Sequence, residues 1–235
     1  MTKIRCILRK LATTLVVVAV WALLLPLAAC AKEPAENGMI TMTTKASEVR
    51  IAIKLIKGSD NLTIAWGDGK ESNVKDAIHE MLPEWFVYAH DYSGTTAHNI
   101  VIAGNFTGLN CYGSQLTALD VSRCTALTEL NCGENQLTAL DVSRNTALSR
   151  LYCNYNQITS LDVSKNTVLG VLSVVGNQLT ASALNNLFRT LPDYSKTDER
   201  GTIYLRERDP RAEGNPGNLD CDRSIAEERG WVFWN

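Results

Sequence analysis

The chain has 235 residues, of which 45% are hydrophobic and 20% charged, and its formal net charge at pH 7 is −2. This composition excludes a disordered or collagen-like chain and supplies enough apolar residues for one domain or two smaller ones. The slight acidic excess gives no counterion-release drive toward nucleic acid, so we expect no nucleic-acid partner.

The first 29 residues have the pattern of an export signal. Four basic residues precede the apolar run LATTLVVVAVWALLLPLAA, and small residues come directly before Cys30. The junction LAAC, residues 27–30, resembles the lipobox of bacterial lipoproteins. That resemblance implies cleavage of residues 1–29, acylation of Cys30 with a lipid such as palmitate, and a membrane anchor in the bacterial cell envelope. The alternatives are a plain secretory signal and an N-terminal anchor helix, and both also place the rest of the chain outside the cytoplasm.

Residues 30–38 predict a flexible tether, because AKEPAENG is small, polar and contains proline. Lys32 and Glu33 are similar to the charged residues that follow the cysteine in surface-exported lipoproteins of some Gram-negative bacteria. The resemblance implies an outer-membrane protein exposed at the cell surface. Removal of residues 1–29 takes away four basic residues and no acidic one, which leaves a net charge of −6.

Residues 39–105 predict a small β-structure. SEVRIAIKL and NLTIAW alternate apolar and polar residues, and WFVYAHDY and NIVIAG indicate two further strands. Asp68-Gly69 predicts a hairpin turn. The turn Trp66–Gly69 and the later pair His90 and Tyr92 resemble the W-x-D-G and H-x-Y signature of the PKD-like β-sandwich. The resemblance implies packing roles, so His90 is expected to be a packed or turn histidine, the alternative being a catalytic base. KDAIHEMLPEW, residues 75–85, predicts a helical insertion.

Residues 106–180 repeat with a period of 21. The shift aligns apolar residues in several columns, one of which is Leu109, Leu130, Leu151 and Leu172. A fixed period of this length indicates a solenoid, in which stacked repeats bury apolar side chains that no single repeat could enclose. From Leu127 one copy is L-x-x-L-x-C-x-x-N-x-L, which resembles the leucine-rich repeat with cysteine in place of a leucine. The predicted fold is therefore mainly β with short helices, a leucine-rich-repeat solenoid preceded by a small β-sandwich.

Two polar columns accompany the leucines. Asn135, Asn156 and Asn177 occupy the position where the leucine-rich-repeat family uses asparagine to bond backbone groups in the turn, and Ser114 replaces them in the first copy. The other column is formed by acidic residues, each two positions before a serine, and predicts side-chain-to-backbone turns, with calcium binding as the alternative. Its members are Asp120, Asp141 and Asp162, followed by Ser122, Ser143 and Ser164.

Residues 181–235 predict atypical capping repeats. TASALNNLFRTLP has helical spacing that ends at Pro192, and TIYL, residues 202–205, alternates as a strand. DRSIAEERG predicts a helix between a capping Asp222 and Gly230, and WVFW predicts a final strand. The segments NPG and CDRSIAEERGW are similar to the C-terminal cap of this subfamily of repeat lipoproteins.

The regularly spaced cysteines Cys111, Cys132 and Cys153 could be metal ligands, disulfide partners, a reactive row or small apolar residues. Neighbouring in-register strands lie about 4.8 Å apart, so the outer two would be separated by about 9.6 Å. That distance excludes one zinc ion, whose sulfur ligands lie at about 2.3 Å. Parallel Cβ atoms about 4.8 Å apart also exceed the usual disulfide separation. We therefore expect the three to pack as small buried hydrophobes, with Val174 in the same place of the next repeat.

A binding site is predicted on the concave face, formed by the outward strand residues. Tyrosines and amides on a rigid scaffold suit a polar partner, because rings supply contact area at low entropy cost. The proposed residues are Asn110, Tyr112, Glu129, Asn131, Arg150, Tyr152, Asn154 and Tyr155. A protein or peptide is the expected partner, and a glycan beside a polysaccharide uptake system is the alternative. Alternatively, these residues form only the polar face that every solenoid has.

An enzyme is not expected. The histidines, His79, His90 and His98, lack metal-site spacing, and no phosphate loop or nucleophile elbow occurs. Glu227 and Glu228 are adjacent on a predicted helix and point apart. We therefore predict no catalytic residue, no metal and no cofactor.

Overall fold

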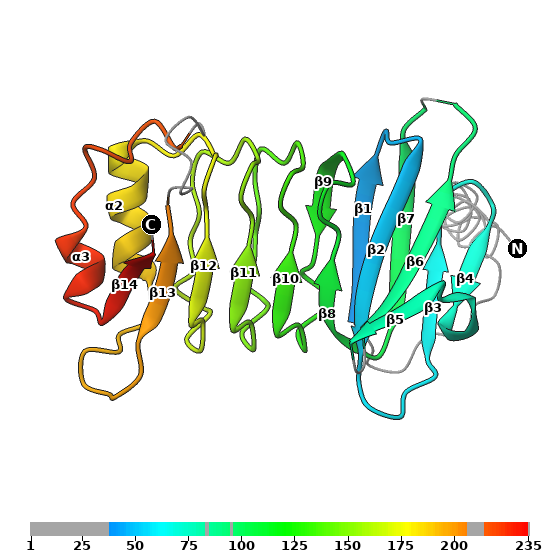
Figure 1. The fold of residues 1–235 in the computed structure, drawn as a ribbon, viewed down its shortest axis with the longest axis horizontal. Coiled ribbons are helices and arrows are strands. Elements are labelled where there is room, and N and C mark those ends of the chain that lie inside the picture. The colour runs from blue at the N-terminus through cyan, green and yellow to red at the C-terminus, as the bar shows by residue number, and fades with distance from the viewer. Residues whose placement is uncertain (1–37, 83–84, 95, 206–213, 235) are drawn as a thin grey trace, which may run out of the picture. The chain divides into compact units, whose positions relative to one another are not determined.

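The computed structural model describes residues 38–82, 85–94, 96–205 and 214–234. The predicted signal peptide, Cys30 and the tether through residue 37 lie outside these residues. Most of the regular structure that is described is β-strand, with two α-helices near the C-terminus (Figure 1). No helix in these ranges is long and apolar enough to cross a bilayer.

The strands form two hydrogen-bonded sheets. The larger has nine strands in the order β14-β13-β12-β11-β10-β8-β2-β6-β5, and the smaller has five in the order β4-β3-β7-β1-β9. The strand bounds are β1 Gly38–Thr44, β2 Glu48–Leu55, β3 Leu62–Ala65, β4 Glu71–Asn73, β5 His79–Leu82, β6 Trp85–Asp91, β7 His98–Gly104, β8 Phe106–Asn110, β9 Leu116–Asp120, β10 Glu129–Asn131, β11 Arg150–Tyr152, β12 Val171–Ser173, β13 Gly201–Tyr204 and β14 Trp231–Trp234.

Six parallel strands, β8 and β10–β14, carry the predicted repeat. The 21-residue alignment is confirmed by the pairing register, in which Leu109 lies opposite Leu130, Leu130 opposite Leu151 and Leu151 opposite Leu172. All four leucines are fully buried. Strands β13 and β14 extend the same parallel pairing after the strict period has ended, as the predicted capping strands require.

Strand β8 joins the repeats to the N-terminal segment. It pairs in parallel with β10 on one side and antiparallel with β2 on the other. Likewise β9, which belongs to the first repeat, pairs antiparallel with β1 of the smaller sheet. One cluster of buried apolar side chains runs through both segments. The predicted boundary at residue 105 therefore falls inside two continuous sheets.

The N-terminal strands include one that the sequence analysis missed. Strand β1 begins at Gly38, the last residue of the predicted tether, and lies between β7 and β9 in the smaller sheet. Its inward residues Ile40, Met42 and Thr44 are buried, but threonine and methionine gave a weak alternation signal. The predicted strands at residues 47–55, 61–66, 85–92 and 99–104 are confirmed as β2, β3, β6 and β7.

The predicted helix at residues 75–85 is wrong. The segment contains a single 3₁₀ turn, Val74–Asp76, followed by β5. A capping box between Asn73 and Asp76 supports this one turn, and the backbone becomes extended at Ala77. Strand β5 then pairs with β6 at the end of the larger sheet. Pairing with an existing strand therefore overrides the helical tendency of the sequence.

Two helices flank the last strands. The predicted helix after residue 180 is confirmed as α2, Ala181–Thr190, capped by Thr180 and ended at Leu191. The predicted helix after residue 222 is shorter than expected, because α3 covers only Ser224–Glu227. Asp222 accepts hydrogen bonds from the Ser224 backbone nitrogen and hydroxyl, although the N-cap position is Arg223.

Asparagine side chains connect successive repeats, as predicted. The Nδ2 group of Asn156 donates to the carbonyl oxygens of Cys132, Cys153 and Asn154, and its Oδ1 accepts from the Leu137 backbone nitrogen. Asn135 and Asn177 repeat this arrangement. Asn215 adds a further member that the sequence analysis did not assign, bonding Val174 and Leu179. We call these four residues the asparagine ladder.

A second column of buried asparagines, Asn145 and Asn166, lies in the repeats away from the asparagine ladder. Asn145 donates to the carbonyl oxygens of Val121 and Cys124, and Asn166 donates to those of Val142 and Asn145. Both asparagines are fully buried, and the sequence analysis missed this role. Cys124 stands 21 residues before Asn145, where its sulfur packs close to Gly38.

The acidic column makes the predicted local turns. Oδ1 of Asp120, Asp141 and Asp162 accepts a hydrogen bond from the backbone nitrogen two residues later. Hydrogen bonding to the following serine lowers the pKa of Asp120 and Asp141 below the ordinary value. The carboxylates therefore have a structural use in each repeat.

The cysteine column is buried, as predicted. Cys111, Cys132 and Cys153 are fully buried free thiols, and Val174 is buried at the corresponding place. Burial raises the pKa of Cys111 and Cys153 to about 12, and it raises the pKa of Cys132 well above the ordinary value. These thiols are therefore neutral at physiological pH and pack as apolar groups.

Replacement of Asn156 with alanine should lower the free energy of unfolding by about 3 kcal/mol, because several buried backbone groups lose their partner. Urea unfolding followed by circular dichroism measures this change. The matched control is Gln157→Ala at the adjacent exposed position, which should change it by less than about 0.5 kcal/mol. Equal effects of the two substitutions would contradict the role assigned to the asparagine ladder.

The buried thiols should resist alkylation in the native state. With iodoacetamide at pH 8, we expect the partly exposed Cys221 to be modified first, and the three column cysteines only after unfolding. Peptide mass spectrometry resolves each site. Native-state modification of the column at the rate of Cys221 would show that the sulfurs are accessible.

Candidate functional site

The candidate binding surface is the outer face of the parallel strands. Along each strand, residues alternate between the buried interior and this face. The pairing register arranges the outward residues in two rows across the strands. The first row is Gly108, Glu129, Arg150, Val171, Thr202 and Val232, and the second is Asn110, Asn131, Tyr152, Ser173, Tyr204 and Trp234.

Five of the predicted site residues lie in these rows. Asn110, Glu129, Asn131, Arg150 and Tyr152 come from β8, β10 and β11. The two amides are partly occupied locally, since Oδ1 of Asn110 accepts from the Tyr112 backbone nitrogen and Oδ1 of Asn131 accepts from that of Gly133. The amides therefore order the ends of their strands as well as facing outward.

The other three predicted residues follow the strand ends. A Cβ atom at Gly133 would lie 3.0 Å from Oδ1 of Asn154 and 3.1 Å from Cδ2 of Tyr112, so both side chains close over this glycine. Tyr155 has a positive φ of 53°, and its ring packs over Gly176. Tyr112 is 44% exposed, but Tyr155 is largely committed to packing at the edge.

A charged pair and a phenol lie at the centre of the face. Nη1 of Arg150 is 3.6 Å from Oε2 of Glu129 on the neighbouring strand. Such an exposed pair contributes little stability, so both charges remain usable by a partner. Burial is the main cause that raises the pKa of Tyr152 above its ordinary value, and the negative charge of the nearby Glu129 adds to it. The Tyr152 hydroxyl is therefore protonated at neutral pH.

The face extends beyond the predicted residues toward the C-terminus. Tyr204 and Trp234 continue the second row, and their ring centroids are 6.5 Å apart. Ser173, whose neighbours in the row are Tyr152 and Tyr204, is only 7% exposed. The alternation in TIYL and WVFW predicted the two strands. It did not predict this row of side chains, because the row depends on the pairing register across three strands.

The same face continues onto the antiparallel strands. Lys54 of β2 pairs with both Gly108 and Trp85. A Cβ atom at Gly108 would lie 2.9 Å from the Trp85 ring, so the indole covers this glycine beside Glu129. The sequence carried no signal for this extension, since the pairing of β2 with β8 is a long-range contact.

His90 is held in an aromatic cluster. Its Nε2 lies 2.9 Å from Oδ2 of Asp68, Trp66 stacks on its ring at 4.7 Å, and Tyr92 contacts it edge-on. The Tyr92 hydroxyl donates to the Trp66 carbonyl oxygen. Hydrogen bonding to His90 lowers the pKa of Asp68. These contacts give His90 a packing role between the hairpin turn and β6.

The described side chains do not form a metal-binding cluster. No group of three or more His, Cys, Asp or Glu residues in that part of the chain is placed to hold an ion. The three aspartates of the acidic column each bond their own turn instead.

Comparison with known proteins gives similar structures of limited extent. The functional domain of InlJ from Listeria monocytogenes, which includes a cysteine ladder, is 26% identical over 54% of this chain and 29% of that one, with a TM-score of 0.34. An internalin, inlF, from the same species is 22% identical over 54% of this chain and 33% of that one, with a TM-score of 0.39. The chain thus spans about a third of the length of these structures. No protein-family model matches the sequence, and no curated protein matches it.

Proposed function

We propose that this chain is a non-catalytic lipoprotein of the bacterial cell envelope, with a leucine-rich-repeat solenoid whose outer face binds a protein or peptide. The observation that carries the proposal is the arrangement of Tyr152, Tyr204 and Trp234 in one row, beside the Glu129–Arg150 pair. Aromatic residues and arginine are the side chains that most often dominate binding energy in protein interfaces.

Rigidity of the face supports this function. The rows stand on parallel strands whose turns are bonded by the asparagine ladder, so binding would immobilise few backbone degrees of freedom. The face also combines both charges with phenol and amide groups. A protein surface or an extended peptide offers matching groups of every kind.

The anchoring part of the proposal rests on sequence alone. LAAC at residues 27–30 follows a basic and then an apolar segment, which supports acylation of Cys30, and the charged Lys32 and Glu33 after it support attachment to the outer membrane. An anchor of this kind would hold the chain at the membrane.

A photocrosslinker tests the location of binding. With p-benzoylphenylalanine in place of Tyr152, we expect one discrete adduct in intact cells exposed to host or bacterial extracts. The same amino acid at Lys165, exposed on the connection between β11 and β12, should give none. The substitution Arg150→Ala should reduce affinity for the captured partner about tenfold, or about 1.4 kcal/mol. Adducts from Lys165 and none from position 152 would move the site to another surface.

A glycan is the second candidate ligand, because the aromatic row is a feature of sugar-binding surfaces. A glycan array with residues 31–235 tests it, with Tyr204→Ala as the variant and Lys165→Ala as the control. Retention of defined polysaccharides that is lost only in the Tyr204 variant would support the glycan. Absence of retention together with a protein adduct at position 152 would exclude it.

A further inference from the structure

The larger sheet ends at β14 with main-chain groups directed outward. The Gly201 backbone nitrogen donates to the Gly230 carbonyl oxygen at 3.2 Å, which sets the pattern between β13 and β14. In a parallel pair, successive residues direct their N–H and C=O groups to alternate sides. Val232 therefore faces β13, whereas Trp231 and Phe233 direct their peptide groups to the open side. In the described part of the chain, no further strand pairs there.

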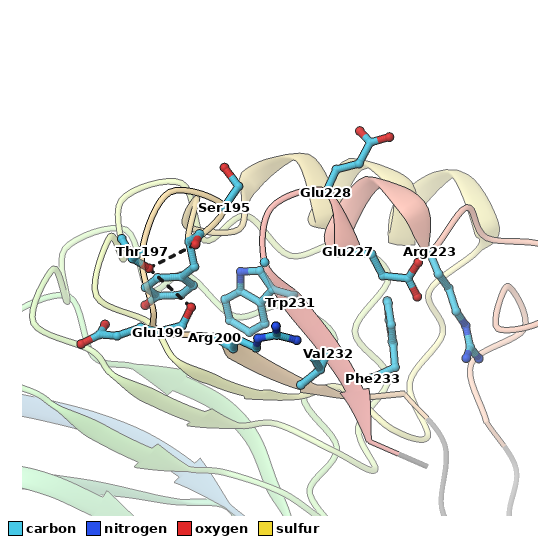
Figure 2. A pocket seen from close by; sticks show the side chains of 12 residues that line it. Ser195, Thr197, Glu199, Arg200, Arg223, Glu227, Glu228, Trp231, Val232 and Phe233 are labelled. Carbon is cyan, nitrogen blue, oxygen red and sulfur yellow. Dashed lines mark hydrogen bonds between the residues drawn. The ribbon is translucent and has the colours of Figure 1, made fainter.

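A groove of about 690 Å³ lies against this strand. Gly230–Phe233 form part of its lining, together with five residues between positions 194 and 200 and residues of the α3 region. Figure 2 shows β14 between Thr197, Glu199 and Arg200 on one side and Arg223, Glu227 and Glu228 on the other. Its volume is in the range of sites that enclose a ligand.

Charges of both signs line the groove. The ion pairs found among the described residues involve none of Glu199, Arg200, Arg223, Glu227 and Glu228. The Arg223 guanidinium lies 5.0 Å from the centroid of the Phe233 ring, and this cation–π contact holds it beside the strand.

We propose that β14 receives an extended peptide of another protein, which adds as a further strand and places charged side chains against Arg200, Arg223 and the α3 glutamates. The alternating peptide groups of Trp231 and Phe233 fit strand addition, since main-chain hydrogen bonds supply affinity and flanking side chains supply specificity. The lining holds two arginines and three glutamates, so an extended chain that carries both charges complements it.

The groove meets the rows of the outer face at Val232, the last residue of the first row. Glu129, Arg150 and Tyr152, at the centre of the outer face, do not line the groove. Either site can therefore fail without the other.

A phage-displayed library of random 12-residue linear peptides, selected on the full-length protein, provides the probe. We expect enriched peptides that lose at least tenfold in affinity with Arg223→Glu and keep their affinity with Arg150→Ala. Each peptide is then synthesised with N-methyl groups on one or the other set of alternate amides. One methylated series should bind at least tenfold more weakly, and the other should bind as the parent does, because only one set of N–H groups faces β14.

Three results would overturn the inference. They are the absence of enriched sequences, equal binding of the two methylated series, and loss of binding with Arg150→Ala but not with Arg223→Glu. The last result would assign the peptides to the outer face and support the proposed function instead. Circular dichroism of each variant excludes unfolding as the cause of a loss.

Discussion

The repeated part of this protein depends on how the buried backbone groups of its turns are hydrogen-bonded. Each turn between a strand and the following connection leaves carbonyl groups that no strand can pair. An asparagine from the next repeat donates to them and accepts from a backbone nitrogen, as Asn156 does with Cys132 and Leu137. Asn156 also donates to Cys153 and Asn154 in its own repeat, so the asparagines fix both the turn and the distance to the neighbouring strand.

This constraint explains the behaviour of the chain at both ends of the repeats. At the N-terminal end, Ser114 stands where the asparagine would be, and its hydroxyl donates to the Arg50 carbonyl oxygen in β2. The first repeat is thus stabilised by the antiparallel strands instead of by a preceding repeat. At the C-terminal end, Asn215 continues the ladder by bonding Leu179 and Val174, and β13 and β14 continue the parallel pairing. The strands β1 and β2 thus adjoin the first repeat, and β13 and β14 adjoin the last one.

The nine-stranded sheet, which the parallel strands share with β2 and β6, also decides which side chains lie on the outer face. Since β2 and β6 continue the face of the parallel strands, Lys54 and Trp85 lie on the same surface as Glu129 and Arg150. Burial assigns the cysteines to the interior of the same strands, and it removes them from chemistry by holding their thiols neutral. The last residue of a strand and the residue that follows it can therefore serve recognition and packing respectively, as Tyr152 and Cys153 show.

The sequence by itself determined the repeat, its strands, the leucine and cysteine columns, and the turn chemistry of the aspartates and of Asn135, Asn156 and Asn177. These features are local or recur every 21 residues, so a single chain reports them through periodicity. It also located most of the outward residues between Asn110 and Tyr155. Only the tertiary structure decided that β5 forms in place of a helix, that Gly38–Thr44 is a strand inside the smaller sheet, and that Tyr204, Trp234 and Trp85 join the outer face. Each of these depends on pairing between segments far apart in the chain, and the hydrogen bonds gained in that pairing outweigh the local preferences that a sequence displays.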